Sequence, residues 1–566
     1  MMRRKSLGGK IVVALSMMGF IGSVFAIDLP ASGADGNIVL DTANGEYVAT
    51  TDVVCTQVVF SANNISVDLS AGGGKTISIP STVTSDGFAF SERYFAASIL
   101  GGTWDFGGGA SLKVGSSHHD HAVTIDGTKV RNVKGAIIGD NRKNCRLTLT
   151  NGAELVAESM RITSSANSGY GTFEILGGST ASFSGNFIPD DGTTVGSGSN
   201  ILTIDGAGSS LSVPNKDVLF GRGCSNDRMV VTDGGSATLL SLAIGGSLNG
   251  TGATNTRLTV DNATLTTTGN MTIGSGGFGS MAAFTNATLS VKSIVVGSGA
   301  NSTNNMLVLA GSTLLTQSGA GDDPFFFGNG GNNEVVLTDG FQYTLPGGDL
   351  MAASGGNKVR ICNGAKATKT TISYFGTKGA SCHDNTYSVE PGGTSVLYRV
   401  SLGGCRNKII VDDGVFELTR NSTGALWLGC NTTDAVANPT VGCELVLRGT
   451  KPRYTTAGET LVYGDGKGIL RFELPTAALE TVPMSSGSIT VREGAAIHVS
   501  CDGYLAYLGD ERARVVLARA SSTLTVPQSV LDATNAELPD RCKLVVDGKD
   551  LVLKVRSNKG FILSFR

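Results

Sequence analysis

The chain has 566 residues, of which 79 are glycine and 13 are proline, and its formal charge is −3. So small a charge argues against a nucleic-acid-binding protein, which needs a basic surface to neutralise phosphates. The low proline count excludes collagen and argues against a Pro/Gly-rich disordered chain. Charged residues make up 16% of the chain, below the about 25% of an average soluble domain. This composition is typical of many short strands joined by tight turns.

Residues 1–26 have the features of a secretory signal peptide. A basic start at 3–5 is followed by an apolar run at 11–25, with small residues at the −3 and −1 positions of a cleavage site after Ala26. A membrane anchor is the alternative, but the apolar run is short for a helix that spans a bilayer. We therefore expect a mature chain that starts at Ile27, has no transmembrane helix and is secreted, either extracellular or at the cell surface.

Residues 27–121 contain alternating apolar segments without regular spacing, and we interpret them as an N-terminal cap with the first coils of a repeat. Near the end of this region, His118, His119 and His121 flank Asp120. Imidazoles beside a carboxylate are candidate ligands of a transition metal. However, adjacent residues of a strand point in opposite directions, and an exposed turn is the competing interpretation of these histidines.

From residue 122 to residue 466, a short phrase recurs: alternating apolar residues, then Asp or Asn, then Gly or Ala. Examples lie at 123–127, 202–206 and 258–263. Successive copies of the phrase, with closing residues between 127 and 449, are about 27 residues apart. Each repeat holds three short segments of alternating polarity separated by Gly, Asn and Asp turns, which is typical of one three-stranded coil.

A coil of this kind buries its apolar residues only by stacking on the next coil. The predicted fold is therefore all-β: a single-stranded parallel β-helix, or β-solenoid, with three short strands per coil of about 27 residues and a β cap at each end. We expect the commoner right-handed form and a monomeric rod. Asparagines seven or eight residues before the closing positions predict a hydrogen-bonded ladder along the axis. They are Asn144, Asn226, Asn255, Asn333, Asn357, Asn385 and Asn407.

The coils carry turns of the form Leu-x-Val-x-Asn/Asp-Gly-Ala-x-Leu and stretches such as Ile273-Gly-Ser-Gly276. In these motifs, over about 120–470, the sequence resembles the parallel β-helix of autotransporter passenger domains and of related large secreted bacterial proteins. The resemblance implies the architecture and no particular ligand. Charged residues such as Glu493 and Arg512 interrupt the amphipathic strands that a membrane barrel would need after 449. We therefore expect no fused barrel and predict that residues 467–566 form a C-terminal β cap.

The ten cysteines gain significance from the predicted export, because disulfides persist outside the cytoplasm. Cys405 and Cys430 each follow a Leu-Gly corner, and stacked corners lie about 4.8 Å apart, within the reach of a disulfide. Cys382 is the competing partner of Cys405, since both lie shortly before asparagines of the predicted ladder. Buried free thiols are the alternative.

Export, a rigid scaffold and a polar exterior predict a non-enzymatic adhesin, carbohydrate-binding protein or structural surface protein. Its partners would be surface glycans or polymers of a host or matrix, and it would need no cofactor. The alternative is a polysaccharide lyase or hydrolase, since pectate lyases and polygalacturonases also use β-helices. Such an enzyme needs carboxylates that converge on one face. Asp322 and Asp323, in a longer insertion before Pro324, are the catalytic candidates, and calcium is the candidate cofactor of a lyase.

Overall fold

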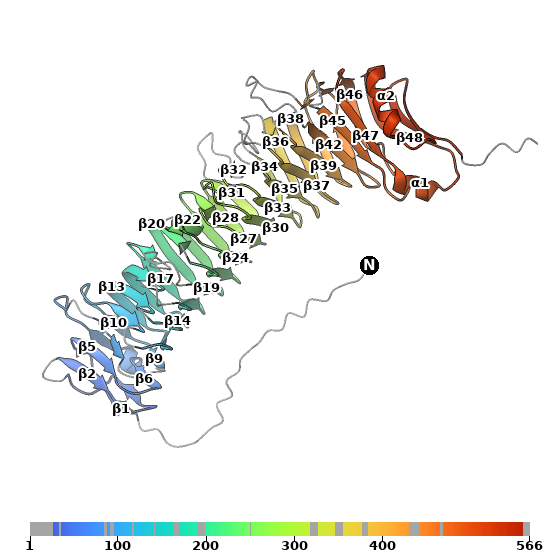
Figure 1. Cartoon of the computed structure of the whole chain (residues 1–566). Helices are drawn as coiled ribbons and strands as arrows, with labels where there is room; N and C mark the ends of the chain where they lie inside the picture. Colours follow the sequence, from blue (N-terminus) through green and yellow to red (C-terminus); the bar gives the residue numbers. More distant parts are fainter. Residues whose placement is uncertain are drawn as a thin grey trace, which may run out of the picture.

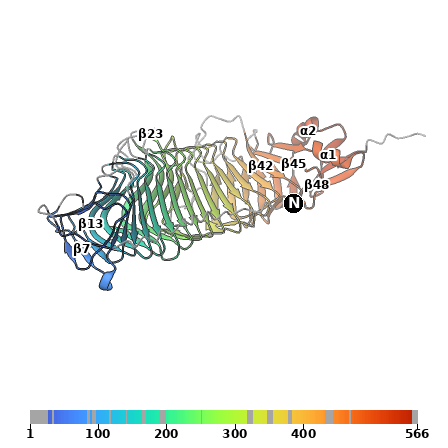
Figure 2. The same cartoon turned by 90° about the horizontal axis from the view of Figure 1, so that it is seen from below.

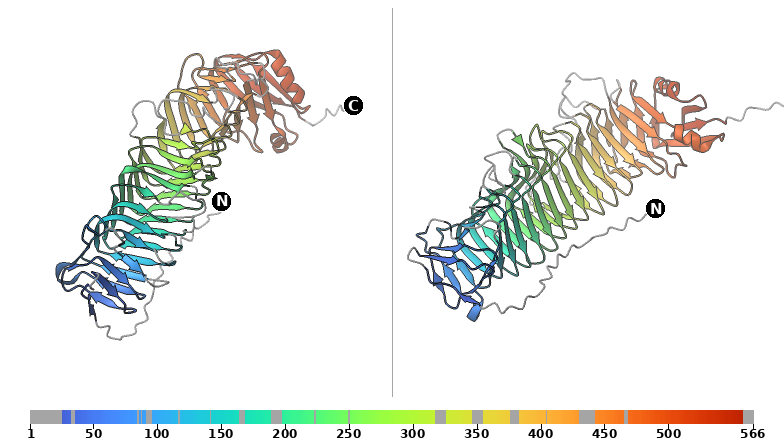
Figure 3. Two further views of the ribbon diagram at one scale, coloured as in Figure 1. Left: turned by 60° about the vertical axis from the view of Figure 1, so that its left-hand side comes forward. Right: turned by 60° about the horizontal axis from the view of Figure 1, so that its bottom comes forward.

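The computed structural model shows a long, gently curved rod built from coils stacked along its length (Figure 1). The stack is continuous from the first strands to the C-terminal cap in every view (Figures 2 and 3). The structure describes residues 26–557 with the exception of 33–35, 84–85, 87, 91–95, 116–117, 141, 164–168, 189–197, 223, 249–250, 317–325, 346–354, 376–382, 404, 430–441 and 465–467.

The first face of the rod is a 19-stranded parallel sheet. Each strand pairs with the equivalent strand of the next coil, so that Leu149 lies opposite Ile175, 26 residues later. Alternate side chains point inward, as Val123 and Ile125 do in Ala122–Asp126, because successive residues of a strand face opposite sides. The strands are, in spatial order, β1 (Ile27–Asp28), β3 (Glu46–Val48), β6 (Ile65–Asp68), β9 (Ala96–Leu100), β12 (Ala122–Asp126), β14 (Arg146–Thr150), β16 (Thr172–Leu176), β19 (Ile201–Asp205), β21 (Arg228–Thr232), β24 (Arg257–Asp261), β27 (Met281–Thr285), β30 (Met306–Ala310), β33 (Glu334–Thr338), β35 (Lys358–Ile361), β37 (Thr386–Val389), β39 (Lys408–Asp412), β42 (Cys443–Arg448), β45 (Gly468–Glu473) and β47 (Ala496–Ser500).

The second and third faces are formed by the remainder of each coil. β10 (Thr103–Asp105) pairs with the first part of β13 (Lys129–Ile138), and β11 (Leu112–Val114) pairs with its last part. Where two short strands have fused into one, as in β13, a bulge at the corner shifts the register, and the chain passes from the second face to the third. The other strands of these faces are β2 (Asn37–Leu40), β4 (Val53–Val54), β5 (Gln57–Phe60), β7 (Thr76–Ser78), β8 (Phe88–Phe90), β15 (Glu154–Arg161), β17 (Thr180–Phe183), β18 (Phe187–Ile188), β20 (Ser210–Arg222), β22 (Ser236–Leu248), β23 (Thr251–Gly252), β25 (Thr264–Thr267), β26 (Met271–Ser275), β28 (Thr288–Val291), β29 (Ile294–Val296), β31 (Thr313–Thr316), β32 (Phe326–Phe327), β34 (Gln342–Leu345), β36 (Lys366–Phe375), β38 (Thr394–Leu402), β40 (Val415–Leu418), β41 (Leu426–Leu428), β43 (Arg453–Thr456), β44 (Glu459–Val462), β46 (Met484–Val491) and β48 (Ala513–Thr525).

The predicted architecture is confirmed. The chain is an all-β parallel solenoid with turns of about 26 residues and three stacked parallel sheets. The apolar residues of all coils merge into one continuous core, as expected when no coil can bury its apolar face alone.

Two adjacent columns of residues, both just before the first-face strands, explain the repeated asparagines. In the outer column the backbone is left-handed, with φ of 57° at Asn144, 64° at Asn226 and 56° at Asn255. Asparagine tolerates this conformation better than most residues. The next residue along the chain occupies an inner column, where Asn333 and Asn407 are buried. The asparagines spaced eight residues before the closing positions belong to the outer column, and those spaced seven before belong to the inner one.

The inner column forms a buried hydrogen-bonded ladder. The backbone N–H of Asn305 donates to the side-chain oxygen of Asn333 at 3.0 Å, and that of Asn333 donates to Asn357 at 2.9 Å. The same bond, 2.9 Å long, joins Asn357 to Asn385 and Asn385 to Asn407. The predicted ladder therefore exists, but the prediction merged two columns that differ by one residue.

Aromatic side chains stack inside the C-terminal part of the rod. The ring centroids of Phe375 and Tyr387 are 5.2 Å apart, those of Tyr387 and Phe416 are 6.1 Å apart, and those of Phe416 and Tyr454 are 6.0 Å apart. The Tyr387 hydroxyl is satisfied by the Ser395 hydroxyl at 2.7 Å. Burial raises the pKa of both tyrosines far above the usual value, so these rings stay neutral.

The C-terminal end is covered by a cap that contains two helices, α1 (Asp502–Leu508) and α2 (Gln528–Glu537), together with the hairpin of β49 (Cys542–Asp547) and β50 (Asp550–Val555). β50 pairs antiparallel with both β48 and β49. α2 lies over β47, where the Thr534 hydroxyl donates to the Ile497 carbonyl at 2.8 Å. The helices are an addition to the predicted β cap. Over the part of the chain that the structure describes, no helix is both long and apolar enough to span a bilayer.

Candidate functional site

Several of the residues singled out in the sequence lie outside the described residues. Asp322 and Asp323 belong to the segment 317–325, and Cys382 and Cys430 fall in other segments of this kind. Cys405 is described: it is partly exposed and lies across an isolated β-bridge from His383. Among the cysteines in the described segments, no two lie at bonding distance. The pairing of Cys405 with Cys430 or Cys382 stays a prediction, because both partners lie outside those segments.

The histidine cluster is divided between two environments. His119 lies in a partly exposed bend, where its Nδ1 accepts the backbone N–H of Lys143 at 2.8 Å. His121 is fully buried in the inner column, and its ring centroid is 6.2 Å from that of His118. Within the described segments, no three His, Cys, Asp or Glu side chains are grouped to hold a metal ion. The structure therefore does not bring the three histidines together as a ligand set.

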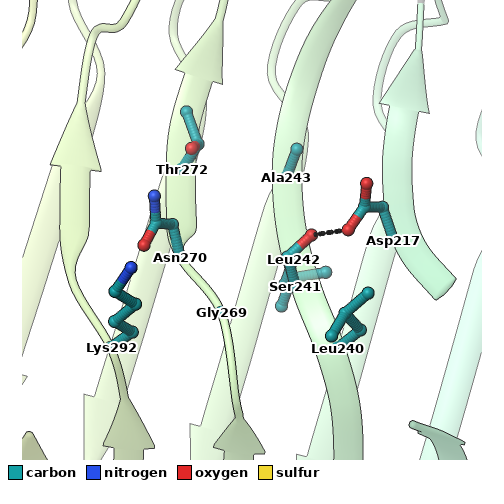
Figure 4. Close-up of a pocket in the computed structure, with 9 residues that line it drawn as sticks. All are labelled: Asp217, Leu240, Ser241, Leu242, Ala243, Gly269, Asn270, Thr272 and Lys292. Carbon is teal, nitrogen blue, oxygen red and sulfur yellow. Dashed lines mark hydrogen bonds between the residues drawn. The ribbon is translucent and has the colours of Figure 1, made fainter. Parts of the chain in front are cut away.

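A polar hollow lies on the surface where the second and third faces meet, and its volume is about 340 Å³. Asp217, Ser241, Asn270 and Lys292 line it from four successive coils (Figure 4). The Ser241 hydroxyl donates to the Asp217 carboxylate at 2.5 Å. The side chains of Lys292 and Asn270 point toward one another in Figure 4. Asp217, Asn270 and Lys292 are exposed, so a ligand can approach them directly.

The corner of the coils holds these side chains in a row. At this corner, the N–H of Gly269 donates to the Leu240 carbonyl at 2.6 Å, and the N–H of Leu242 donates to the Asn270 carbonyl at 3.2 Å. In the next coil, the N–H of Lys292 donates to the Gly269 carbonyl at 3.1 Å. The backbone under the hollow is therefore fixed before any ligand binds.

The chemistry of the hollow suits a ligand rich in hydroxyl groups. A carboxylate accepts hydrogen bonds, an ammonium donates them, and the hydroxyl and amide groups between them do both. Asp217 and Lys292 are three coil spacings apart, or about 14 Å along the axis at about 4.8 Å per spacing. Sequence reasoning missed this site because its members are far apart in the chain. Aligning the coils on the corner after the second strand would have placed Asp217, Ser241 and Asn270 in one column.

A second exterior feature pairs a cation with an aromatic ring. The guanidinium of Arg399, in β38, lies 3.7 Å from the ring centroid of Trp427, in β41. This geometry is a cation–π contact, and it covers the ring face on which a sugar would stack. Tyr398, the preceding residue, is 38% exposed. The arrangement is self-contained and is a weaker match to a ligand than the hollow.

Charged side chains on the first face neutralise one another between coils. Arg360 forms two hydrogen bonds to Glu390, of 2.7 and 2.8 Å, and reaches Glu334 at 3.4 Å. The bonds from Arg360 hold the pKa of the Glu390 carboxyl below its usual value. In a later coil, Arg471 lies 3.1 Å from Glu444. These pairs tie neighbouring coils together, and their hydrogen-bonding capacity is directed to one another.

No protein-family model matches this sequence, and no curated protein matches it either. The family of the chain is therefore not identified by comparison, and the functional argument depends on the geometry described above.

Proposed function

We propose that this protein is an exported, non-enzymatic rod that binds hydroxyl-rich polymers, such as surface glycans, in the hollow lined by Asp217, Ser241, Asn270 and Lys292. The observation that carries the proposal is the hollow itself: four polar side chains of different hydrogen-bonding character line one open site of about 340 Å³. This volume falls within the range of small-ligand sites, at the lower end.

The rigidity of the scaffold supports the same proposal. The residues of the hollow stand on coils whose corners are joined by backbone hydrogen bonds, so little conformational freedom is lost when a ligand binds. The hollow is open and its charged groups are solvated, which favours weak binding at a single site. A surface glycan would then be held through many copies of the rod rather than through one tight contact.

We further propose that the chain is kin to the passenger domains of autotransporters and acts as a monomeric adhesin or structural element outside the cell. The β-solenoid fold and the signal-peptide pattern of residues 1–26 support this proposal. The fold alone does not identify the family, because solenoids of this kind carry many activities.

A binding assay on immobilised polysaccharides tests the proposed function. The probes are a neutral glucan, polygalacturonate and a sulfated glycosaminoglycan, and binding of the full chain is followed by biolayer interferometry. We expect at least one probe to bind and Asp217→Ala and Lys292→Ala each to weaken it by about 10-fold or more, since a hydrogen bond to a charged group contributes about 1.5–3 kcal/mol.

Lys134→Ala is the matched control, because Lys134 is another exposed lysine at a corner and is paired with Glu158. It should leave binding unchanged. Absence of binding to all three probes would overturn the proposal, as would equal binding by the wild type and both hollow variants.

The same samples separate binding from catalysis. A polysaccharide lyase would release products with a new carbon–carbon double bond, and a hydrolase would release reducing ends. The hollow does not offer the pair of carboxylates that a hydrolase uses: among its lining residues only Asp217 is acidic, and it already accepts a hydrogen bond from Ser241. Turnover that depends on Asp322 and Asp323 would replace the proposed function with the enzymatic one.

A further inference from the structure

Two buried thiols meet at the C-terminal end of the rod. The sulfur atoms of Cys501 and Cys542 are 3.9 Å apart. Cys501 is 2% exposed and Cys542 is 7% exposed, and they are separated by 41 residues in the sequence. A disulfide has a sulfur–sulfur distance of about 2.05 Å, so the two atoms must approach each other by about 2 Å for the bond to form.

The two cysteines stand at a structurally important junction. Cys501 directly follows β47, the last strand of the first face, and precedes α1, whereas Cys542 is the first residue of β49. Between them lie α1, β48 and α2. α2 is attached on both sides: Thr534 bonds to β47, and the Asn535 side chain bonds to both backbone groups of Leu544, at 2.6 and 3.0 Å. A link between the cysteines would therefore fasten the whole cap to the last coil.

We propose that Cys501 and Cys542 form a disulfide that locks the cap onto the rod. The oxidant is a protein disulfide or a low-molecular-weight disulfide. One thiolate attacks the oxidant, giving a mixed disulfide and releasing one thiol, and the second thiolate displaces the other thiol. The cysteine pair loses two protons and two electrons, and the oxidant is reduced to two thiols. That the protein meets such an oxidant depends on the proposed export. The ability of Cys501 and Cys542 to form the disulfide does not depend on export.

Burial determines when the bond forms. It raises the pKa of the Cys501 thiol to about 12 and also raises the pKa of Cys542. Because the thiolate is the reacting species, the folded, reduced cap reacts slowly with oxidants. Oxidation therefore precedes or accompanies docking of the cap, and the completed bond is then protected from reductants by the same burial.

The bond matters because a solenoid opens from its ends. Each coil contacts only its neighbours, so loss of the cap exposes the next coil. Closing a 41-residue loop reduces the conformational freedom of the opened cap. We therefore expect amide exchange in β49 and β50 to be about 100- to 1000-fold slower in the oxidised protein where exchange proceeds through opening of the cap.

Peptide mapping tests the bond directly. The full chain is refolded with oxidised and reduced glutathione, its remaining thiols are alkylated under denaturing conditions, and it is digested with trypsin. Cleavage after Arg492, Arg512, Arg541 and Lys543 yields residues 493–512 joined to the dipeptide 542–543 when the disulfide is present. Reduction should separate the two peptides and restore two alkylatable thiols.

The control is Cys362, a buried cysteine whose Sγ lies 3.7 Å from the Leu337 carbonyl oxygen, and which should be recovered alkylated. Recovery of Cys501 and Cys542 as alkylated thiols after oxidative refolding would overturn the proposal, as would a cross-link of either one to another cysteine. Exchange in β49 that is equal in the oxidised and reduced wild-type chains would show that no clamp exists, and this comparison needs no substitution. The outcome is independent of whether the hollow binds glycans. If the disulfide is found in refolded protein but the two cysteines are free thiols in protein isolated from cells, the proposed export is refuted, and the ability of the pair to form the bond still stands.

Discussion

Replacement of Asn333 by alanine should open the middle of the inner ladder. The Asn333 side chain accepts the backbone N–H of Asn305 at 3.0 Å and donates to the carbonyls of Ser302 at 3.1 Å and Gly330 at 3.0 Å. All of these bonds are buried, and leaving a buried polar group without a partner costs about 1–3 kcal/mol. The side-chain amide of Asn305 donates to the same Asn333 oxygen at 3.0 Å. With four groups affected and some relaxation, we expect Asn333→Ala to lower the free energy of local unfolding by about 3–5 kcal/mol.

Hydrogen exchange is the appropriate assay, because long repeat arrays need not unfold in one step. The amides of β30 and β33 should exchange at least about 100-fold faster in the variant, since about 1.4 kcal/mol corresponds to a factor of ten. Asn332→Gly is the matched control: its φ is 57°, which glycine adopts without strain, and its side chain is exposed. Equal protection of β30 in Asn333→Ala and Asn332→Gly would refute the assignment of the ladder as a stabilising element.

Three further changes probe other parts of the rod. The hydrogen bond from Arg406 lowers the pKa of the Asp384 carboxyl to about 2. The contribution of this pair to stability is therefore complete at pH values above the unfolded-state pKa of about 3.9, and it is lost as the pH falls through about 2. NMR titration should show this pKa rising toward about 4 in Arg406→Gln, and an unchanged pKa would contradict the pairing. Phe416→Ala removes a fully buried ring and should lower the local unfolding free energy in β40 by about 3–5 kcal/mol. Amide-exchange rates in β40 that equal those of the wild type would contradict this prediction. Gly245→Ala would place a Cβ 1.9 Å from the Ser280 hydroxyl at a φ of 73°, and it should destabilise β22 by about 1–3 kcal/mol, whereas unchanged exchange in β22 would show that the corner can relax.

The repeat could be predicted from the sequence because the residues that determine each strand and turn are close together in the chain. Alternation in segments such as 123–127 specifies which residues point inward, and Gly and Asn specify where the chain turns. The inner ladder could be predicted only in part. Asn226 and Asn333 have similar sequence surroundings, but they occupy positions in the coil that differ by one residue. Only the coordinates show that the first adopts a left-handed backbone and that the second is buried.

Contacts that depend on the detailed path between coils could not be predicted. Cys501 and Cys542 are 41 residues apart, in a cap that does not follow the repeat, so no periodicity relates them. The sequence prediction placed disulfides by assuming equivalent corners in neighbouring coils, an assumption that applies only to the regular stack. The hollow was missed for a different reason: Asp217 and Lys292 are ordinary surface residues in the sequence, and only the stacking of four coils brings them to the same hollow.

The solenoid separates the residues that stabilise it from those available to bind. Asn333 is buried and bonded on several sides, so its replacement is costly, whereas Asp217 and Lys292 are exposed and stand on a corner held by backbone bonds. Surface substitutions away from special features usually change stability by less than about 0.5 kcal/mol. The exterior can therefore change its ligand while the interior remains constant. This division explains why the inward-facing residues of the sequence predict the fold but say little about the ligand. For the same reason, variants of the hollow should alter binding without altering the amide-exchange protection of the strands beneath it.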